Sequence, residues 1–154
     1  MINKRIMVIG PKGSGKTTLV NYINGFTGKL RKSQDVIYTA LTMDVPSGYL
    51  EQPFRNSYII SLAQNAWCVL FLVDQSDLTE LYSPGFAKAV QCKKRIGIVS
   101  KCDLKTENYE DSVKMLKKIG LDEPYYSISI PNNIGIEELM EHLKILKEGG
   151  NYTK

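Results

Sequence analysis

The hydrophobic residues follow two spacings along the chain: short continuous apolar runs, and stretches with an apolar residue every three or four positions. Continuous runs are typical of buried strands, and the wider spacing is typical of helices with one apolar face. Strands are predicted at about 4–10, 36–39, 41–43, 66–73, 96–99 and 125–129. Helices are predicted over about 16–25, from Pro53 to 63, between the fourth and fifth strands, over 109–120, and from 136 to a stop at Gly149.

The order of these elements predicts the architecture. The series β-α-β-β-α-β-α-β-α-β-α requires a mainly parallel sheet with helices on both faces, which is an α/β fold. The run at 66–73 is apolar at every position, as expected of a central strand buried on both faces. With 154 residues and 43% hydrophobic content, the chain suits one domain spanning 1–154. Ligands of such sheets bind at the carboxyl ends of the strands.

The turn between the first strand and the first helix matches the phosphate-binding pattern GxxxxGK[ST]. It reads Gly10, Pro11, Lys12, Gly13, Ser14, Gly15, Lys16 and Thr17, with Thr18 next in the helix. Three of these residues, the glycines, can adopt backbone angles closed to other residues, so consecutive N–H groups can converge on a phosphate at a helix N-terminus. Lys16 is expected to reach the β- and γ-phosphates, and the Thr17 hydroxyl to bind Mg²⁺. The pattern therefore predicts a P-loop nucleotide-binding domain.

Composition and charge change this picture little. The net charge of +4 includes basic clusters at 29–32 and 93–95, which we interpret as solvated loop ends and not as a nucleic-acid site. No apolar stretch reaches the roughly 20 residues of a membrane span, so we expect no membrane contact and a cytoplasmic protein. The spacing of the cysteines favours isolated thiols over a disulfide framework or a zinc site; they are Cys68, Cys92 and Cys102.

Two further segments at strand ends concern the base of the nucleotide. Ser100-Lys101-Cys102-Asp103 resembles the [NT]KxD motif of Ras-like GTPases, in which the Asp carboxylate accepts two hydrogen bonds from guanine. Ser129 and Ile130 resemble the SAK loop of the same proteins, with the Ile130 N–H available to the guanine carbonyl. The alternatives are a solvated strand end and an ordinary strand-to-helix loop. The resemblance implies GTP as the nucleotide, with ATP as the alternative.

The segment from Asp44 to Gly48 occupies the place of the DxxG motif of switch II. Asp44 would hold Mg²⁺ through a water, and the N–H of Ser47 would approach the γ-phosphate. Many Ras-like enzymes carry a water-orienting Gln where this chain has Gly48, so we expect slow unaided hydrolysis. Arg55 is a candidate for an internal charge-stabilising arginine, although an exposed helix residue is the simpler interpretation. Asp74 is interpreted as a structural cap at the end of the central strand.

Across nearly its full length the chain resembles the EutP/PduV family of ethanolamine and propanediol utilisation proteins. The resemblance rests on Gly10–Leu19 with Asn24 and Gly25, Lys32–Gln34, Asp44–Pro46, Tyr49–Pro53, Ser83–Ala87 and Ile96–Lys101. The chain departs from the family at Ser47-Gly48, where the family has Gly-Glu. Within the resemblance, Ser33 is the candidate switch I hydroxyl that binds Mg²⁺. The resemblance implies a bacterial cytosolic setting, with shell or core proteins of a microcompartment as partners.

Three functions remain open on this basis. The first is GTP binding with slow hydrolysis, in which Lys16, Thr17 and Asp44 carry the chemistry. The second is phosphoryl transfer to a small carboxylate, as in an acetate or propionate kinase, because a kinase must suppress attack by water. The third is a nucleotide-binding assembly module without turnover.

Overall fold

The computed structural model describes residues 5–25, 35–39 and 41–152. Its strands are β1 (Arg5–Ile9), β2 (Ile37–Tyr38), β3 (Thr42–Asp44), β4 (Ala66–Asp74), β5 (Lys94–Ser100) and β6 (Tyr126–Ser127). Its α-helices are α1 (Lys16–Asn24), α2 (Asn56–Ala63), α3 (Phe86–Ala89), α4 (Tyr109–Ile119) and α5 (Ile136–Tyr152). Short 3₁₀ turns occur at Ser47–Tyr49, Pro53–Arg55 and Thr106–Asn108.

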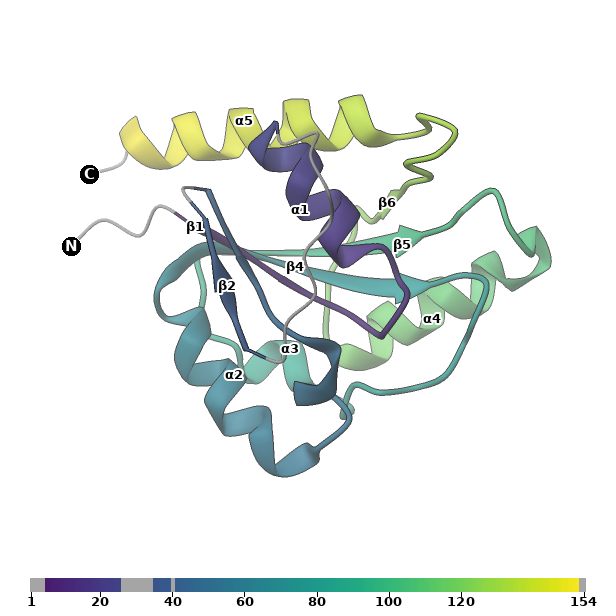
Figure 1. The fold of residues 1–154 in the computed structure, drawn as a ribbon, viewed down its shortest axis with the longest axis horizontal. Coiled ribbons are helices and arrows are strands. Elements are labelled where there is room, and N and C mark those ends of the chain that lie inside the picture. Colours follow the sequence, from purple (N-terminus) through teal and green to yellow (C-terminus); the bar gives the residue numbers. More distant parts are fainter. Residues whose placement is uncertain (1–4, 26–34, 40, 153–154) are drawn as a thin grey trace.

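The strands form one sheet in the order β2-β3-β1-β4-β5-β6. Only the edge strand β2 runs antiparallel, against β3, and the other neighbouring pairs are parallel. Helices α1 and α5 cover one face of the sheet, and α2, α3 and α4 cover the other (Figure 1). The predicted mainly parallel sheet with helices on both faces is therefore confirmed.

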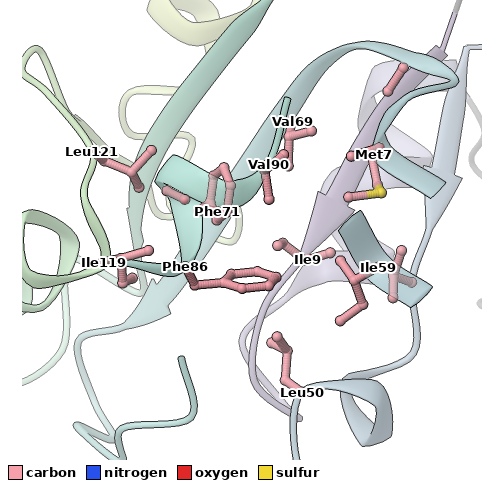
Figure 2. Close-up of a cluster of buried hydrophobic side chains, with 14 of the residues drawn as sticks. Met7, Ile9, Leu50, Ile59, Val69, Phe71, Phe86, Val90, Ile119 and Leu121 are labelled. Atoms are coloured by element: carbon pink, nitrogen blue, oxygen red, sulfur yellow. The ribbon is translucent and has the colours of Figure 1, made fainter. Parts of the chain in front are cut away.

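The core has two layers because successive side chains of a strand point to opposite faces. Met7 and Ile9 of β1 and Phe71 of β4 pack toward α2 and α3, where they meet Ile59 and Phe86 (Figure 2). The intervening strand residues Val8, Leu70 and Leu72 pack toward α1 and α5, where they meet Leu19 and Leu139. Nearly every residue of β4 is buried, as predicted from its unbroken apolar run.

Several element boundaries differ from the prediction: α2 begins at Asn56, after a 3₁₀ turn that starts at Pro53, β5 begins at Lys94, and α5 and β6 differ for reasons that can be named. Helix α5 continues through Gly149 to Tyr152, because glycine lowers helix propensity by only about 1 kcal/mol and does not itself end a helix. Strand β6 covers only two of the predicted residues 125–129, because the backbone of Ser129 pairs with Ile134 and not with β5. Among the described residues, no helix combines the length and the apolar character that crossing a membrane requires. All three cysteines are free thiols.

Candidate nucleotide-binding site

The phosphate-binding loop lies between β1 and α1, at the carboxyl end of β1. Gly13 and Gly15 have φ angles of +78° and +90°, in the left-handed region that glycine adopts without strain. Gly10 is needed for a different reason from the predicted one: it has no positive φ, but an added Cβ would lie 2.8 Å from Leu72 Cβ. The loop therefore depends on close packing against β4 as well as on backbone freedom.

Helix α1 begins directly after this loop. Gly15 is its N-cap, no side chain caps it, and its first turn contains no acidic residue. The first N–H groups of the helix and the partial positive charge of its N-terminus thus face the loop without a competing carboxylate from α1. This end of α1 can bind a phosphate.

Lys16, Thr17 and Asp44 are brought together at the start of α1 and the end of β3. The Thr17 hydroxyl donates to Asp44 Oδ2 at 3.2 Å. Burial lowers the pKa of Lys16, partly opposed by the nearby carboxylates of Asp44 and Glu51. Burial raises the pKa of Asp44, opposed by Lys16 and by the Thr17 hydrogen bond. Burial thus acts against both charged forms, which is typical of side chains placed for binding or catalysis.

The Thr17 hydroxyl and the Asp44 carboxylate are neighbouring hard oxygen donors, the type of ligand that suits Mg²⁺. Within residues 5–25, 35–39 and 41–152, no group of three or more His, Cys, Asp or Glu side chains is arranged to hold a metal. The donor pair fits an ion that keeps most of its waters and takes few protein ligands. Ser33, the third predicted Mg²⁺ ligand, lies outside the described residues.

A cavity of about 1190 Å³ opens beside the loop. Lys12, Lys16, Thr17 and Thr18 form one group of its lining residues, and the segment that begins at the last residue of β3 supplies a second group. The second group is Asp44, Pro46, Ser47, Gly48, Tyr49, Glu51, Gln52, Phe54, Arg55 and Tyr58. The cavity thus joins the predicted phosphate site to the predicted switch segment.

The sequence did not predict that two charged residues, Glu51 and Arg55, line this cavity. Glu51 was not among the predicted site residues, although it lines the cavity and acts electrostatically on Lys16. Arg55 lines the cavity too, with its guanidinium carbon 4.7 Å from the centre of the Tyr49 ring. The turns at Ser47–Tyr49 and Pro53–Arg55 create this contact, and no periodic spacing in the sequence marks it.

The predicted base-binding residues lie on the loops after β5 and β6. Lys101 has a φ of +55° and its Nζ lies 3.2 Å from Asp74 Oδ2. Asp74 also accepts hydrogen bonds from the backbone and hydroxyl of Ser76, which confirms it as a cap. Ser100, at the end of β5, is buried and donates its hydroxyl to the Val73 carbonyl at 3.1 Å.

Asp103 is exposed, and its Oδ2 accepts a hydrogen bond from Asn132 Nδ2 at 2.8 Å. The Cys102 N–H donates to the Ile128 carbonyl at 3.0 Å and joins the two loops. Ser129 is buried and Ile130 half-buried. Because β1, β3, β4, β5 and β6 are parallel, these loops and the phosphate loop follow strand ends at the same edge of the sheet (Figure 1).

Several known proteins are similar to this chain over nearly its whole length. The PduV-EutP family model, described as "Ethanolamine utilisation - propanediol utilisation", matches residues 3–145. The propanediol utilization protein PduV of Citrobacter freundii is 29% identical, with 98% of this chain and 99% of the relative covered. A protein of Escherichia coli (strain K12) named "Probable acetate kinase EutP" is 26% identical, with 97% of each chain covered.

Solved structures show the fold. The crystal structure of a probable GTP-binding protein engB superposes with a TM-score of 0.67 at 19% identity, covering 94% of this chain and 99% of that one. The FeoB G-domain from Methanococcus jannaschii gives a TM-score of 0.61 at 23% identity, covering 94% and 97%. The chain therefore has the fold of P-loop GTPase domains, as predicted.

Proposed function

Because the chain belongs to the PduV-EutP family of ethanolamine and propanediol utilisation, we propose that it binds GTP with Mg²⁺ and hydrolyses it slowly within such a pathway. The observation that carries the proposal is the contact between Thr17 and Asp44 next to the buried Lys16. These three groups form a cation and phosphate site, and the exposed Asp103 lies at the same edge of the sheet. We also propose a cytoplasmic location, with shell or core proteins of a microcompartment as partners.

Each residue of the site has a distinct task in this proposal. The N–H groups of the glycine loop and the Lys16 ammonium bind the β- and γ-phosphates. Thr17 and Asp44 hold Mg²⁺, which when bound neutralises charge on the phosphate oxygens. Asp103 accepts hydrogen bonds from the N–H groups of guanine. Adenine cannot pair with Asp103 in the same way.

Hydrolysis is expected to be slow because no side chain at position 48 can orient the attacking water. Arg55 lies over the Tyr49 ring, and the Phe54 ring centre is 5.8 Å from the same guanidinium carbon. A cation held against aromatic rings must leave them before it can stabilise charge on a phosphoryl group. We therefore expect a rate on the scale of unassisted Ras-like GTPases, roughly 10⁻⁴ to 10⁻³ per second.

Phosphoryl transfer to a short-chain carboxylate, with ATP or GTP as the donor, is the second candidate. It is favoured by the cavity that Lys16 and Arg55 both line, because a carboxylate paired with Arg55 would share the space into which a γ-phosphate projects. The name "Probable acetate kinase" printed for the Escherichia coli relative points to the same chemistry. An acyl phosphate would then form where the GTPase proposal expects inorganic phosphate.

One experiment separates the two functions. Purified protein is incubated with Mg²⁺ and γ-labelled GTP or ATP, with and without acetate or propionate, and the label is followed into phosphate or acyl phosphate. Lys16→Ala should lose both nucleotide binding and turnover, whereas Lys144→Ala, at an exposed position of α5, should keep them. Release of free phosphate from GTP, unaffected by the carboxylate, supports the GTPase. Carboxylate-dependent acyl phosphate supports the kinase, and binding without turnover rejects both.

A further inference from the structure

A hydrogen bond between side chains connects the two loops that carry the predicted base-binding residues. Asn132 Nδ2 donates to Asp103 Oδ2 at 2.8 Å, and both side chains are exposed. Asp103 comes from the loop after β5, and Asn132 comes from the loop between β6 and α5. The sequence did not single out Asn132, because its contact with Asp103 joins residues 29 positions apart.

The loop that carries Asn132 is held as a short hairpin. The Ser129 N–H donates to the Ile134 carbonyl at 3.0 Å, and the Ile134 N–H donates back to the Ser129 carbonyl at 2.9 Å. Gly135 closes the hairpin with a φ of +72°, in a position where an added Cβ would collide with the Ser127 carbonyl. The backbone around Asn132 is therefore fixed by main-chain hydrogen bonds and by close packing.

An exposed carboxylate without a fixed partner samples several rotamers, so it must be ordered before it can pair with two donors on a base. A carboxylate has two oxygens and about four lone-pair sites. The Asn132 amide occupies one site on Oδ2 and leaves Oδ1 and the second lone pair of Oδ2 available. The hydrogen bond can thus orient Asp103 without consuming its capacity to accept from guanine.

The base of the same hairpin also has unused polar capacity. Ser129 is 1% exposed, and its hydroxyl has no hydrogen-bond partner in the part of the chain that the structure describes. A buried hydroxyl without a partner is unfavourable, and a polar ligand group can relieve this. The hairpin that contacts Asp103 through Asn132 therefore contains a second polar group, which has no partner among the described residues.

We propose that Asn132 is a positioning residue for base recognition, whose side-chain amide holds the Asp103 carboxylate in the orientation that accepts two hydrogen bonds from guanine. The proposal rests on the proposed binding of GTP. Asn132 acts through Asp103, so its effect depends on the base and disappears when the Asp103 carboxylate is absent. This makes the role separable from a general effect on the fold.

The test is a double-mutant cycle measured by equilibrium binding of GTP, inosine triphosphate and ATP with Mg²⁺. Asn132→Ala should weaken GTP about fivefold and leave ATP within twofold, because only guanine uses both acceptor positions of Asp103. Asn132→Asp, which has the same shape, should weaken GTP more, because its carboxylate repels Asp103. In an Asp103→Ala background, Asn132→Ala should change GTP affinity by less than twofold.

Several results would overturn the proposal. A rise in GTP affinity in Asn132→Ala would mean that the amide competes with the base. Equal losses of GTP and ATP, or a full loss in the Asp103→Ala background, would assign Asn132 to loop packing alone. A wild-type protein that prefers GTP but is indifferent to Asn132→Ala rejects only the positioning role. A wild-type protein that binds ATP as well as GTP rejects the proposed function and the positioning role together.

Discussion

At the scale of single residues, Gly48 sets the limit on the chemistry of the site. It lines the cavity beside Lys16 and contributes no functional group. Its φ is not in the left-handed region, and no heavy atom lies within 4 Å of a Cβ built there. The backbone and the surrounding space therefore accept a side chain at this position, although the chain has none.

Gly48→Gln should increase GTP hydrolysis by about tenfold or more, because the amide can orient a water toward the γ-phosphate. The measurement is the single-turnover release of labelled phosphate. Gly48→Ala is the matched control, since it adds a Cβ but no amide. Equal rates in the two variants would show that position 48 does not face the attacking water.

Thr17 offers a second test at this scale, because its hydroxyl already contacts Asp44. Thr17→Ala should raise the Mg²⁺ concentration needed for half-maximal nucleotide binding by roughly tenfold, since one oxygen ligand is lost. Thr17→Ser keeps the hydroxyl and should restore the wild-type requirement. A titration in which Thr17→Ala matches wild type would remove Thr17 from the set of Mg²⁺ ligands.

At the scale of elements, Tyr82 ties the strand before the phosphate loop to its neighbour. Its hydroxyl lies 2.8 Å from the Leu72 carbonyl of β4 and 3.2 Å from the Ile9 carbonyl at the end of β1. Its ring packs against Phe71 and Phe86. Burial raises the pKa of Tyr82 well above its usual value, so the hydroxyl remains a donor throughout the physiological pH range.

Tyr82→Phe should lower the free energy of unfolding by about 1 kcal/mol, because it removes a buried donor and leaves carbonyl oxygens without it. For a domain of this size, that corresponds to a fall of roughly 2–4 °C in Tm. Chemical denaturation measures it, with Tyr109→Phe as a control at an exposed tyrosine. A Tyr82→Phe variant as stable as the control would show that the bridge contributes nothing.

Elements with a strong local signal could be predicted from the sequence. Strand β4 could be predicted because residues 66–73 are all apolar. Helix α4 could be predicted because its apolar residues recur with helical spacing and a glycine, Gly120, follows; in the structure Gly120 has a φ of +107°. The contacts of Tyr82 with Ile9 and of Asn132 with Asp103 could not be predicted, because they join distant segments whose separation only the fold sets. The phosphate loop was recognisable because its chemistry lies in eight consecutive residues.

At the scale of the whole molecule, the stability of the fold depends on two side chains of the site, Lys16 and Asp44, because burial disfavours the charged form of each. The raised pKa of Asp44 means that its contribution to stability falls as pH rises from about 3.8 through its folded-state pKa. The lowered pKa of Lys16 means that its charged form destabilises the folded state. This loss of stability is recovered only as pH rises from the lowered pKa toward 10.5. At pH values between the folded-state pKa of Asp44 and that of Lys16, both groups are charged and the burial of each opposes folding, apart from their mutual attraction.

The double variant Lys16→Met with Asp44→Asn should therefore be at least as stable as wild type at pH 7 without nucleotide, because desolvation outweighs the attraction between the two charges. Lys16→Met alone should be less stable than the double variant, since Asp44 then lacks its neighbouring cation. As pH falls through the pKa of Asp44, the stability of wild type should rise relative to that of the double variant.

The free energy of unfolding of wild type should increase by about 2.7 kcal/mol, or roughly 5–10 °C in Tm, with GTP and Mg²⁺ at a hundred times the Kd. The double variant should gain nothing, and calorimetry with and without nucleotide measures both effects. A double variant that melts several degrees below wild type without nucleotide would contradict this prediction. It would mean that the charge pair of Lys16 and Asp44 stabilises the folded state.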